Sequence, residues 1–506
     1  MPREVGSSLG ELADGLSRRE LLERGAAGAA GLLLGPAAVA CSRDSAPGSV
    51  GPRIVIVGAG LAGLSCAYRL QRRGLASSVY EANPARIGGR CWTAREFAGG
   101  QTGEHGGEFI DSRHRRMRGL AKRFGLELTD LYSIPNPGGW RLWLNGARRR
   151  RSGLGPERRL FQRRIEAAAR SVGAYGYADA TPAARAFDEL SVADWLDQNL
   201  PGGSRGLQGQ LVWAEMASEF GLDADRLSAL NLFYEYVEAT PGADERYHVR
   251  GGNDQIPQAL AAALPDGAIR PGAELEALFA RSDGSYGLRF AGDATDVVAD
   301  RVVLAIPFTT LRRVDLTAAG LSRKKRACIE QLGMGTNAKV LMQFERRPQA
   351  YGRWNGYMIS DDPFLYTWES SLGEPGRGSI ITTYFGGRSG AGGLAASGAH
   401  APTTRRERER NLTSLTQGGA SGLTGLRRGL GGRAWTDRWV ADPWARGSYA
   451  AYLPGQYTRY YGYVGKPEGA IHFAGEHTAT ANLGYLEGAV ESGERAAEAI
   501  ARALRG

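Results

Sequence analysis

Cysteine and histidine are scarce in this sequence. Its 506 residues include only four cysteines, Cys41, Cys66, Cys91 and Cys328, and six histidines. The cysteines form no CxxC pair, and no HExxH segment occurs. Disulfide frameworks and zinc sites both depend on characteristic ligand spacings. The sequence therefore predicts neither a disulfide scaffold nor a bound metal.

Lysine is also rare, because arginine carries nearly all of the positive charge. Only five of the 63 basic residues are lysines, and the formal net charge is +10. Arginines gather between residues 148 and 164, but no recognisable nucleic-acid-binding module surrounds them. A solvated helix face explains this cluster, and attraction to an anionic surface is the alternative. We expect no nucleic-acid partner.

The N-terminal apolar stretch, residues 25–40, is too short and too glycine-rich to predict a transmembrane helix. It follows a segment that resembles a twin-arginine export signal, with Arg18 and Arg19 in tandem, although Glu23 replaces the usual lysine. An Ala-x-Ala cleavage site ends at Ala40. We predict that residues 1–40 are a signal peptide for export to the periplasm or beyond. A lipid anchor at Cys41 and a non-functional extension are the alternatives.

Glycine, by contrast, is abundant, and part of it forms a nucleotide-binding pattern. The apolar run 53–57 precedes Gly58, Gly60 and Gly63 in GxGxxG spacing, and a helix-forming stretch follows. The motif requires a tight turn, close approach of the backbone to a pyrophosphate, and close helix–strand packing. Glu81, which ends a second strand-like run, can accept hydrogen bonds from ribose hydroxyls. This order predicts a Rossmann-like dinucleotide-binding domain.

Two further segments favour FAD over a nicotinamide cofactor. Arg86, Gly88, Gly89 and Arg90 follow the acid directly, and an Ala-Gly-Glu triplet ending at Glu476 lies near the C-terminus. FAD is long, so its ribityl and isoalloxazine parts must be held by chain far from the first loop. A nicotinamide enzyme has no need of this second segment.

With these motifs the chain resembles the flavin-containing amine oxidases, a family that includes monoamine, polyamine and L-amino-acid oxidases. The resemblance runs from about residue 50 to 504. It implies an α/β fold in which a Rossmann-like FAD-binding domain is interleaved with an α+β substrate-binding domain of mixed sheet and helices. It also implies that FAD contacts Arg86, Gly88, Gly89, Arg90, the backbone near Leu275, and Glu476.

The expected domains are discontinuous. Residues 50–111, 246–312 and 438–506 would form the FAD-binding domain, and residues 112–245 and 313–437 the substrate-binding domain. We expect strands at residues 338–344, 364–369 and 379–385, and helices at residues 212–220 and 226–237. Residues 386–404 are rich in glycine and alanine, and we expect a loose surface insertion there.

The resemblance also suggests which residues react. Lys339 corresponds to the family lysine that bonds flavin N5 through a water and aids reaction with dioxygen, and Tyr449 and Tyr485 to the two rings that flank the substrate amine. Ser448 stands where animal monoamine oxidases carry the cysteine that tethers the flavin, so non-covalent FAD is expected. Phe109 occupies the position where many L-amino-acid oxidases place an arginine for the substrate carboxylate, which favours an amine.

The expected activity is therefore oxidation of a small amine by hydride transfer to FAD, with dioxygen as the electron acceptor. The products would be an imine, which hydrolyses to aldehyde and ammonia, and hydrogen peroxide. An L-amino-acid oxidase that forms a 2-oxo acid is the main alternative. A flavin desaturase or porphyrinogen-type oxidase and a non-catalytic flavin protein are further hypotheses. The sequence does not fix the oligomeric state, and a homodimer stays open.

Overall fold

The protein is described here by a computed structural model. It describes residues 51–150, 154–237, 242–361, 363–394, 398–416, 422–423 and 425–505. The expected signal peptide and Cys41 lie outside these residues. Within them, no helix is long and apolar enough to cross a membrane, and no group of side chains is arranged to hold a metal ion.

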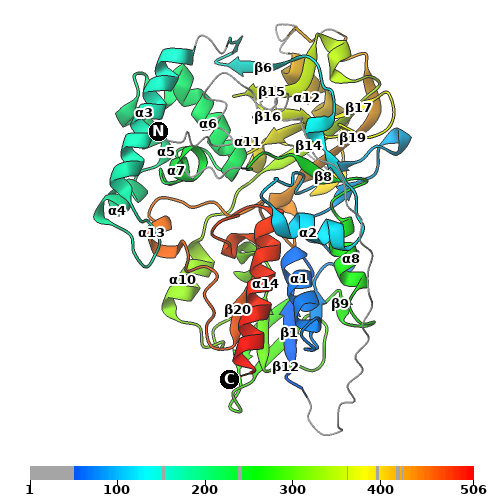
Figure 1. Ribbon diagram of the computed structural model, residues 1–506, viewed down its shortest axis with the longest axis vertical. Coiled ribbons are helices and arrows are strands. Elements are labelled where there is room, and N and C mark those ends of the chain that lie inside the picture. The colour runs from blue at the N-terminus through cyan, green and yellow to red at the C-terminus, as the bar shows by residue number, and fades with distance from the viewer. Residues whose placement is uncertain are drawn as a thin grey trace, which may run out of the picture.

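A five-stranded parallel sheet forms the lower half of the molecule in Figure 1. Its order is β20 (Ile471–Phe473), β13 (Arg301–Leu304), β1 (Ile54–Val57), β2 (Ser78–Glu81) and β9 (Ile269–Pro271). All four side chains of the central strand β1 are buried, because helices and loops cover both faces of a parallel sheet. The expected Rossmann-like core is confirmed.

Two helices from opposite ends of the chain pack side by side on this sheet. They are α1 (Leu61–Gln71) and α14 (Leu486–Ala503), drawn in blue and red in Figure 1. A Cβ atom at Gly493 would come within 2.1 Å of the Ala62 carbonyl oxygen, so glycine is needed for this close approach. The contact joins the first nucleotide-binding segment to the last.

A second sheet of eight strands lies above the first one in Figure 1. Its order is β18-β19-β14-β17-β16-β15-β6-β7, and every neighbouring pair is antiparallel except β15 and β6. All seven side chains of β14 are buried. The strands are β6 (Gly139–Leu144), β7 (Ala147–Arg148), β14 (Ala338–Phe344), β15 (Trp354–Ser360), β16 (Tyr366–Glu369), β17 (Ser379–Phe385), β18 (His400–Pro402) and β19 (Leu430–Arg438).

A group of helices flanks the eight-stranded sheet at the upper left of Figure 1. They are α3 (Gly155–Val172), α4 (Pro182–Asp188), α5 (Val192–Asn199), α6 (Leu207–Phe220) and α7 (Asn231–Tyr236). Helix α6 packs against β6, β15 and β17 and is buried along most of its length. It therefore brings its C-terminal residues close to the space between the two sheets.

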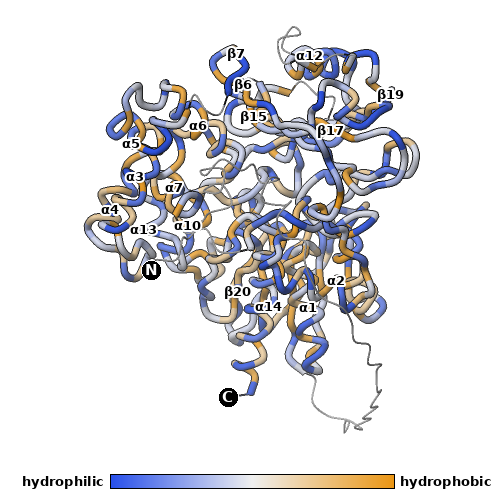
Figure 2. The backbone as a smooth tube through the Cα atoms, turned by 45° about the horizontal axis from the view of Figure 1, so that its top comes forward, coloured by the Kyte–Doolittle hydropathy of each residue, from blue (hydrophilic) through white to orange (hydrophobic). Residues whose placement is uncertain are grey.

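The remaining elements connect these layers or lie at their edges. They are α2 (Arg115–Arg123), α8 (Gln255–Ala262), α9 (Phe308–Leu311), α10 (Arg323–Gln331), α11 (Gly387–Gly392), α12 (Arg405–Thr416), α13 (Tyr457–Tyr460), β3 (Thr93–Ala94), β4 (Gly103–Glu104), β5 (Leu128–Asp130), β8 (Tyr247–Val249), and an antiparallel sheet of β10 (Leu275–Ala280), β11 (Tyr286–Phe290) and β12 (Val297–Ala299). The turn around β7, which begins the arginine cluster, lies at the periphery and is hydrophilic in Figure 2.

Two local predictions were wrong. Residues 226–230 are not helical, because the amide of Ser228 bonds the Tyr452 carbonyl and its hydroxyl bonds Asp188, and a helix begins only at Asn231. Such side-chain bonds compete with helix formation. Residues 386–404 are not a loose insertion throughout, since they include α11 and β18. A Cβ at Gly386 would come within 1.9 Å of the Ala217 carbonyl oxygen in α6, so this glycine-rich start is tightly packed.

Candidate active site

A cavity of about 830 Å³ is lined by residues of both the parallel and the eight-stranded sheets and the loops that follow them. The predicted site residues that line it are Gly58, Gly60, Glu81, Arg86, Gly88, Gly89, Arg90, Leu275, Lys339, Tyr449, Glu476 and Tyr485. Of the predicted set, only Gly63 is absent from the lining. A Cβ there would come within 1.9 Å of the Gly58 carbonyl oxygen, so Gly63 lets α1 pack onto the loop.

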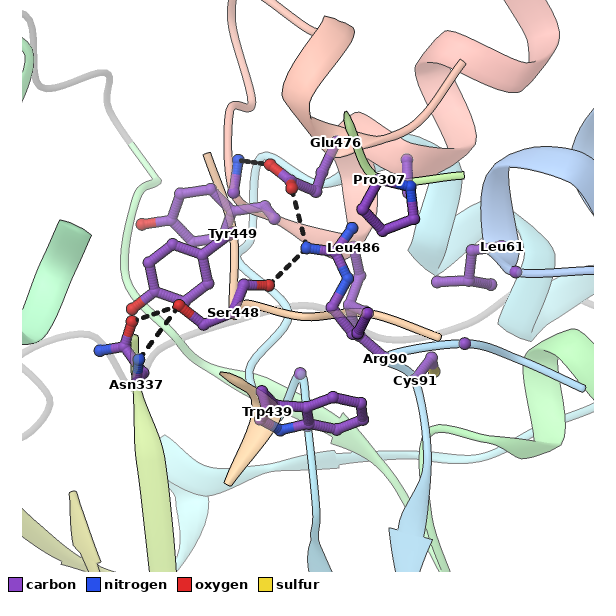
Figure 3. Close-up of a pocket in the computed structure, with 18 of the residues that line it drawn as sticks. Leu61, Arg90, Cys91, Pro307, Asn337, Trp439, Ser448, Tyr449, Glu476 and Leu486 are labelled. Atoms are coloured by element: carbon purple, nitrogen blue, oxygen red, sulfur yellow. Dashed lines mark hydrogen bonds and ion pairs between the residues drawn. The ribbon is translucent and has the colours of Figure 1, made fainter. Parts of the chain in front are cut away.

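The cavity has two ends in different parts of the fold. We call the end lined by Glu81 and Leu275 the cofactor end, and the end lined by Lys339 and Tyr449 the reaction end. Figure 3 shows Leu61, the first residue of α1, on one side and Tyr449 on the other. The cavity therefore extends from the nucleotide-binding loop to the eight-stranded sheet.

The glycine loop at the cofactor end is shaped to receive an anion. Gly58 has a φ of 100°, which favours glycine, and its amide donates a 2.7 Å hydrogen bond to the Tyr80 carbonyl. No atom lies within 4 Å of a Cβ built at Gly60, so the backbone there faces open space. Helix α1 begins at Leu61 with no acidic residue in its first turn. Its amide end can therefore face a pyrophosphate without competition.

Glu81 lies at the end of β2 and is held by the loop itself. One carboxylate oxygen accepts a 2.7 Å hydrogen bond from the Ala59 amide, and the other accepts one of 2.8 Å from Asn83. Burial raises the pKa of Glu81, and these two amides oppose the rise. A carboxylate fixed in this way can still accept hydrogen bonds from ribose hydroxyls, because each oxygen has two lone pairs.

The second glycine segment lies directly against the first. Gly88 pairs with Gly60 in a parallel bridge and has a φ of 93°. A Cβ at Gly89 would lie 3.4 Å from the Cα of Gly60. Together these glycines form one continuous backbone surface at the cofactor end. Larger side chains would occupy the space that a cofactor needs.

Arg90 and Glu476 join the early and late cofactor segments, as Figure 3 shows. An Arg90 guanidinium nitrogen lies 2.9 Å from a Glu476 carboxylate oxygen and also donates to the Ser448 carbonyl. Glu476 accepts a further 3.0 Å hydrogen bond from the Gly484 amide. This ion pair therefore fixes three distant chain segments around the middle of the cavity. The pairing could not be read from the motifs separately.

One row of cross-strand neighbours in the eight-stranded sheet leads to the reaction end. In register, His400 lies opposite Asp437, Asp437 opposite Lys339, Lys339 opposite Tyr384, and Tyr384 opposite Tyr366. Directly opposite residues point to the same face of a sheet. Lys339, Tyr384 and Tyr366 all line the cavity. The strand register therefore builds this wall of the reaction end.

Lys339 is buried at the reaction end, and its ammonium group has three partners. It lies 2.8 Å from a carboxylate oxygen of Glu108 and donates to the carbonyls of Glu104 and Gly106 at 2.9 and 2.8 Å. The other Glu108 oxygen accepts a 2.8 Å hydrogen bond from the Trp368 indole. Lys339 is therefore a fixed positive charge in the cavity wall, paired with a carboxylate that also lines the cavity.

Three tyrosines line the same end. The Tyr384 and Tyr449 hydroxyls are 2.9 Å apart, and Tyr449 also donates a 2.8 Å hydrogen bond to the Ser218 carbonyl at the end of α6. Tyr485 lies at the N-terminus of α14, with its ring centroid 5.1 Å from that of His114. Burial raises the pKa of all three phenols, so they stay neutral at physiological pH.

The motifs missed several residues that the structure places in the reaction end. They include Glu108, Trp368 and Tyr384, described above, and the acids Glu219, Glu235, Asp244 and Glu245. Glu245 has a φ of 48°, which is uncommon for a side chain of its size. Only strand register and the fold bring these residues together. The sole local signal was that Glu108 directly precedes Phe109, which the resemblance had aligned with a substrate-binding position.

These features define a two-domain oxidoreductase with a dinucleotide site in one sheet and a reaction chamber against the other. The open backbone at Gly60, the α1 terminus and the Arg90–Glu476 clamp fit an extended FAD molecule. Residues 61–501 match the family model described as flavin containing amine oxidoreductase. The chain belongs to this family, and the family implies FAD.

Known relatives and structures agree with this assignment. The chain is 28% identical over 478 residues to AofH of Mycobacterium tuberculosis, which carries the name of a flavin-containing monoamine oxidase; the match covers 89% of this chain and 97% of that protein. It is 26% identical over 477 residues to an L-amino-acid oxidase of Siganus canaliculatus, with 88% and 85% covered. Cyclohexylamine oxidase of Brevibacterium oxydans has the same fold, with a TM-score of 0.75, 23% identity, and 90% and 100% covered.

Proposed function

We propose that the protein is an FAD-dependent oxidase of small amines. The substrate would lose a hydride from the carbon next to nitrogen, giving an imine that hydrolyses to aldehyde and ammonia. When bound, FAD supplies the electron acceptor for this step and passes the electrons to dioxygen, which leaves as hydrogen peroxide. The chain itself binds and orients the amine, excludes bulk water and places Lys339 near the reacting atoms.

The observation that carries this proposal is the distribution of charge along the cavity. Among the described residues, the arginines that line the cavity are Arg86, Arg90 and Arg313. Arg86 and Arg90 belong to the second glycine segment. Arg313 is two residues before Asp315, which pairs with Ala277 of β10, and β10 begins at the cofactor end with Leu275. The positive side chains other than Lys339 therefore gather where a pyrophosphate and an adenosine would lie.

Carboxylates line both ends of the cavity, but those of the reaction end have no arginine beside them in the lining formed by the described residues. Glu108, Glu219 and Glu245 are among those of the reaction end. Burial is the main cause of the raised pKa of Tyr384 and Tyr485, and the charges of Glu219 and Glu245 raise it further. Negative charge favours a protonated amine entering the cavity and disfavours a substrate carboxylate.

Phe109 lies where the expected carboxylate-binding arginine would stand. It lines the reaction end, with its ring centroid 5.8 Å from that of Trp368. Arg113 is the nearby cation, but it is paired with Asp111 at 3.1 Å and lies 5.7 Å from the Tyr485 ring centroid, and it is absent from the lining. An L-amino-acid oxidase that turns Arg113 towards its substrate is the second candidate.

Aromatic rings support binding of the amine near the flavin. Tyr449 and Tyr485 line the cavity together with Trp368 and Tyr384. Their π-faces attract a cation and also fit a neutral amine with an apolar chain. The phenol of Tyr449 is fixed through Ser218 and Tyr384, which limits rotation of the ring. A preorganised pocket of this kind loses little entropy on binding.

FAD is proposed to be bound without a covalent link. The Ser448 hydroxyl donates a 2.6 Å hydrogen bond to the Asn337 side chain, as Figure 3 shows. A serine at this position offers no thiol for a thioether bond. We also propose, from the twin-arginine pattern alone, that the folded, FAD-loaded protein is exported.

The proposal is tested by peroxide release from the FAD-loaded protein with matched pairs of substrates. The pairs are tyramine and tyrosine, cadaverine and lysine, and agmatine and arginine. Turnover confined to the decarboxylated member of each pair is expected. Turnover confined to the amino acids would establish the second candidate, and the absence of peroxide with every substrate would contradict an oxidase of either kind.

A further inference from the structure

Two histidines and two aspartates form a buried chain of charges beside the cavity. One Asp437 carboxylate oxygen lies 3.0 Å from His105 Nδ1 and 2.7 Å from His400 Nδ1. His400 Nε2 in turn lies 3.0 Å from a carboxylate oxygen of Asp442. Asp437 and His105 are fully buried, and His400 is nearly so. None of these contacts belongs to the reaction end described above.

The chain of charges reaches the cofactor end at one side and solvent at the other. The same Asp442 oxygen lies 3.7 Å from a guanidinium nitrogen of Arg86. At the opposite end, His105 Nε2 lies 3.6 Å from a carboxylate oxygen of Glu96, a partly exposed side chain. Six groups of alternating sign therefore run from the surface to Arg86.

The chain of charges also links the eight-stranded sheet to the second glycine segment. His400 and Asp437 lie in β18 and β19, at the edge of the eight-stranded sheet, in the same row as Lys339. Arg86 belongs to the second glycine segment, which contacts the nucleotide loop. His400 therefore lies between the eight-stranded sheet and the second glycine segment, which holds Arg86.

Aromatic rings pack against the chain of charges. The Trp92 ring centroid lies 4.3 Å from the Arg86 guanidinium carbon and 3.8 Å from the His105 ring centroid. The Trp439 ring centroid lies 4.6 Å from the His400 ring centroid. Because the middle of the chain of charges is buried, each charge there needs a partner: an uncompensated buried charge lowers the free energy of unfolding strongly.

Asp442 connects this balance of buried charges to the cofactor site. It lines the cavity beside Arg86, so its carboxylate lies where a pyrophosphate would bring further negative charge. An isolated Asp442 would neutralise Arg86 and repel the anion. A positive His400 balances Asp442 and leaves the charge of Arg86 available to the pyrophosphate.

We propose that His400 is a positioning residue for FAD. Held between Asp437 and Asp442, it offsets the carboxylate in the cavity wall and thereby strengthens the hold of Arg86 on the pyrophosphate. The inference concerns the cofactor and is independent of whether the substrate is an amine or an amino acid.

The protonation of the chain supports this role. Burial lowers the pKa of both imidazoles, but the neighbouring carboxylates outweigh burial, so the pKa of His105 rises to about 9 and that of His400 rises as well. Burial would raise the pKa of Asp437 and Asp442, but the histidines lower it. These shifts favour the charged form of each of the four groups.

The charged groups around the histidines fix the direction of the pH dependence. His105 faces Asp437 and Glu96, and His400 faces Asp437 and Asp442. Around them, Arg86 also interacts with Glu81, and Lys339 lies opposite Asp437 in the sheet. Because the folded pKa of His105 lies above the usual value for an imidazole, its contribution to stability is full below about pH 6.5 and is lost as the pH rises through about 9. FAD should likewise be held less tightly as the pH rises and His400, whose pKa is also raised, loses its proton.

The test compares FAD affinity in His400→Gln and in wild type by titrating apoprotein with FAD and following flavin fluorescence. At neutral pH the variant should bind FAD about tenfold more weakly, and the further loss of affinity as the pH is raised should be smaller than in wild type. The control is His472→Gln, which replaces another buried histidine in β20, outside the chain of charges. It should leave FAD affinity within about twofold of wild type.

A second substitution separates the charge effect from general damage. Adding Asp442→Asn to His400→Gln removes the uncompensated carboxylate and should restore much of the FAD affinity. Unchanged affinity in His400→Gln, or weaker binding in the double variant than in the single one, would overturn the proposal. If His400→Gln does not fold, Asp442→Asn alone decides: it should bind FAD at least as tightly as wild type, and weaker binding would contradict the proposed balance.

Discussion

The cofactor end and the reaction end of the cavity are built in opposite ways. The cofactor end is lined by backbone at Gly58, Gly60 and Gly88, by a helix N-terminus, and by arginines that lie among carboxylates such as Glu81 and Asp442. The reaction end is lined by aromatic rings and carboxylates around one buried lysine, Lys339. The first arrangement suits an anion, and the second suits a cationic or neutral amine. One continuous cavity thus combines two opposite electrostatic environments.

This difference indicates that the two ends of the cavity have separate roles. Short motifs with fixed backbone geometry hold the part of the cofactor that does not react. Side chains from β14, β16, β17, α6 and α14 surround the position of the substrate. Substrate preference can therefore change by substitution at the reaction end without disturbing the cofactor end. The predictions below use this separation, from the largest expected effect to the smallest.

Glu476→Gln should have the largest effect, because it breaks the clamp at the middle of the cavity. Arg90 would lose its buried carboxylate partner, so the free energy of unfolding should fall by about 3 kcal/mol and FAD should be lost on purification. Chemical denaturation and the flavin-to-protein absorbance ratio measure both effects. The control Glu127→Gln breaks an exposed pair with Arg250 and should cost less than about 1 kcal/mol. Equal effects of the two substitutions would contradict the clamp.

Lys339→Met should impair the reaction with dioxygen and leave FAD bound. Removing the fixed positive charge should slow reoxidation of the reduced protein about 100-fold, because negative charge develops on dioxygen near this position. Stopped-flow absorbance separates reoxidation from anaerobic reduction by the substrate. The matched control is Lys122→Met, which replaces an exposed lysine of α2 and should behave as wild type. Reoxidation at the wild-type rate in Lys339→Met would remove Lys339 from the proposed mechanism.

Phe109→Arg should shift the reaction end from amines towards amino acids. The new guanidinium would repel a protonated amine and attract a carboxylate beside Trp368. The kcat/KM for the preferred amine should fall about tenfold, and turnover of the matching amino acid should increase. Phe109→Leu changes the shape without adding charge and should not increase amino-acid turnover. If Arg and Leu have the same effect, charge at this position does not select the substrate.

Tyr384→Phe should have the smallest effect. It removes one hydrogen bond to Tyr449 and leaves the Ser218 contact, so kcat/KM should fall about fivefold, equivalent to about 1 kcal/mol. Burial raises the pKa of Tyr384 and Tyr449, so the ratio to wild type should stay constant from about pH 6 to about pH 9. Tyr351→Phe, outside the cavity, is the control. A ratio that changes across this range would mean that a tyrosine ionises there.

The cofactor end could be predicted from the sequence because its determinants are local. The spacing of Gly58, Gly60 and Gly63, with Glu81 closing the next strand, specifies a strand, a turn and a helix in order. The strands at residues 338–344 and 379–385 were also placed correctly. Short-range spacing and periodicity were sufficient in each case.

The reaction end could be predicted only in part. The family resemblance named Lys339, Tyr449 and Tyr485, but the partners of these residues depend on strand register and on the fold. Lys339 and Tyr384 are neighbours only because β14 and β17 pair in one particular register, which no short segment reveals. The pairing of Lys339 with Glu108 joins β14 to the irregular segment that follows β4. The chain from Glu96 to Arg86 required five separate segments to meet. Tertiary structure, and not local preference, determines each of these contacts.

The most direct test of the opposite character of the two ends is anaerobic mixing of the FAD-loaded protein with cadaverine and, separately, with lysine. The loss of flavin absorbance reports reduction by each compound without any contribution from dioxygen. The account predicts rapid bleaching by cadaverine and little or none by lysine, because the two differ only in the carboxylate that the acidic reaction end excludes. Equal or faster bleaching by lysine would contradict it.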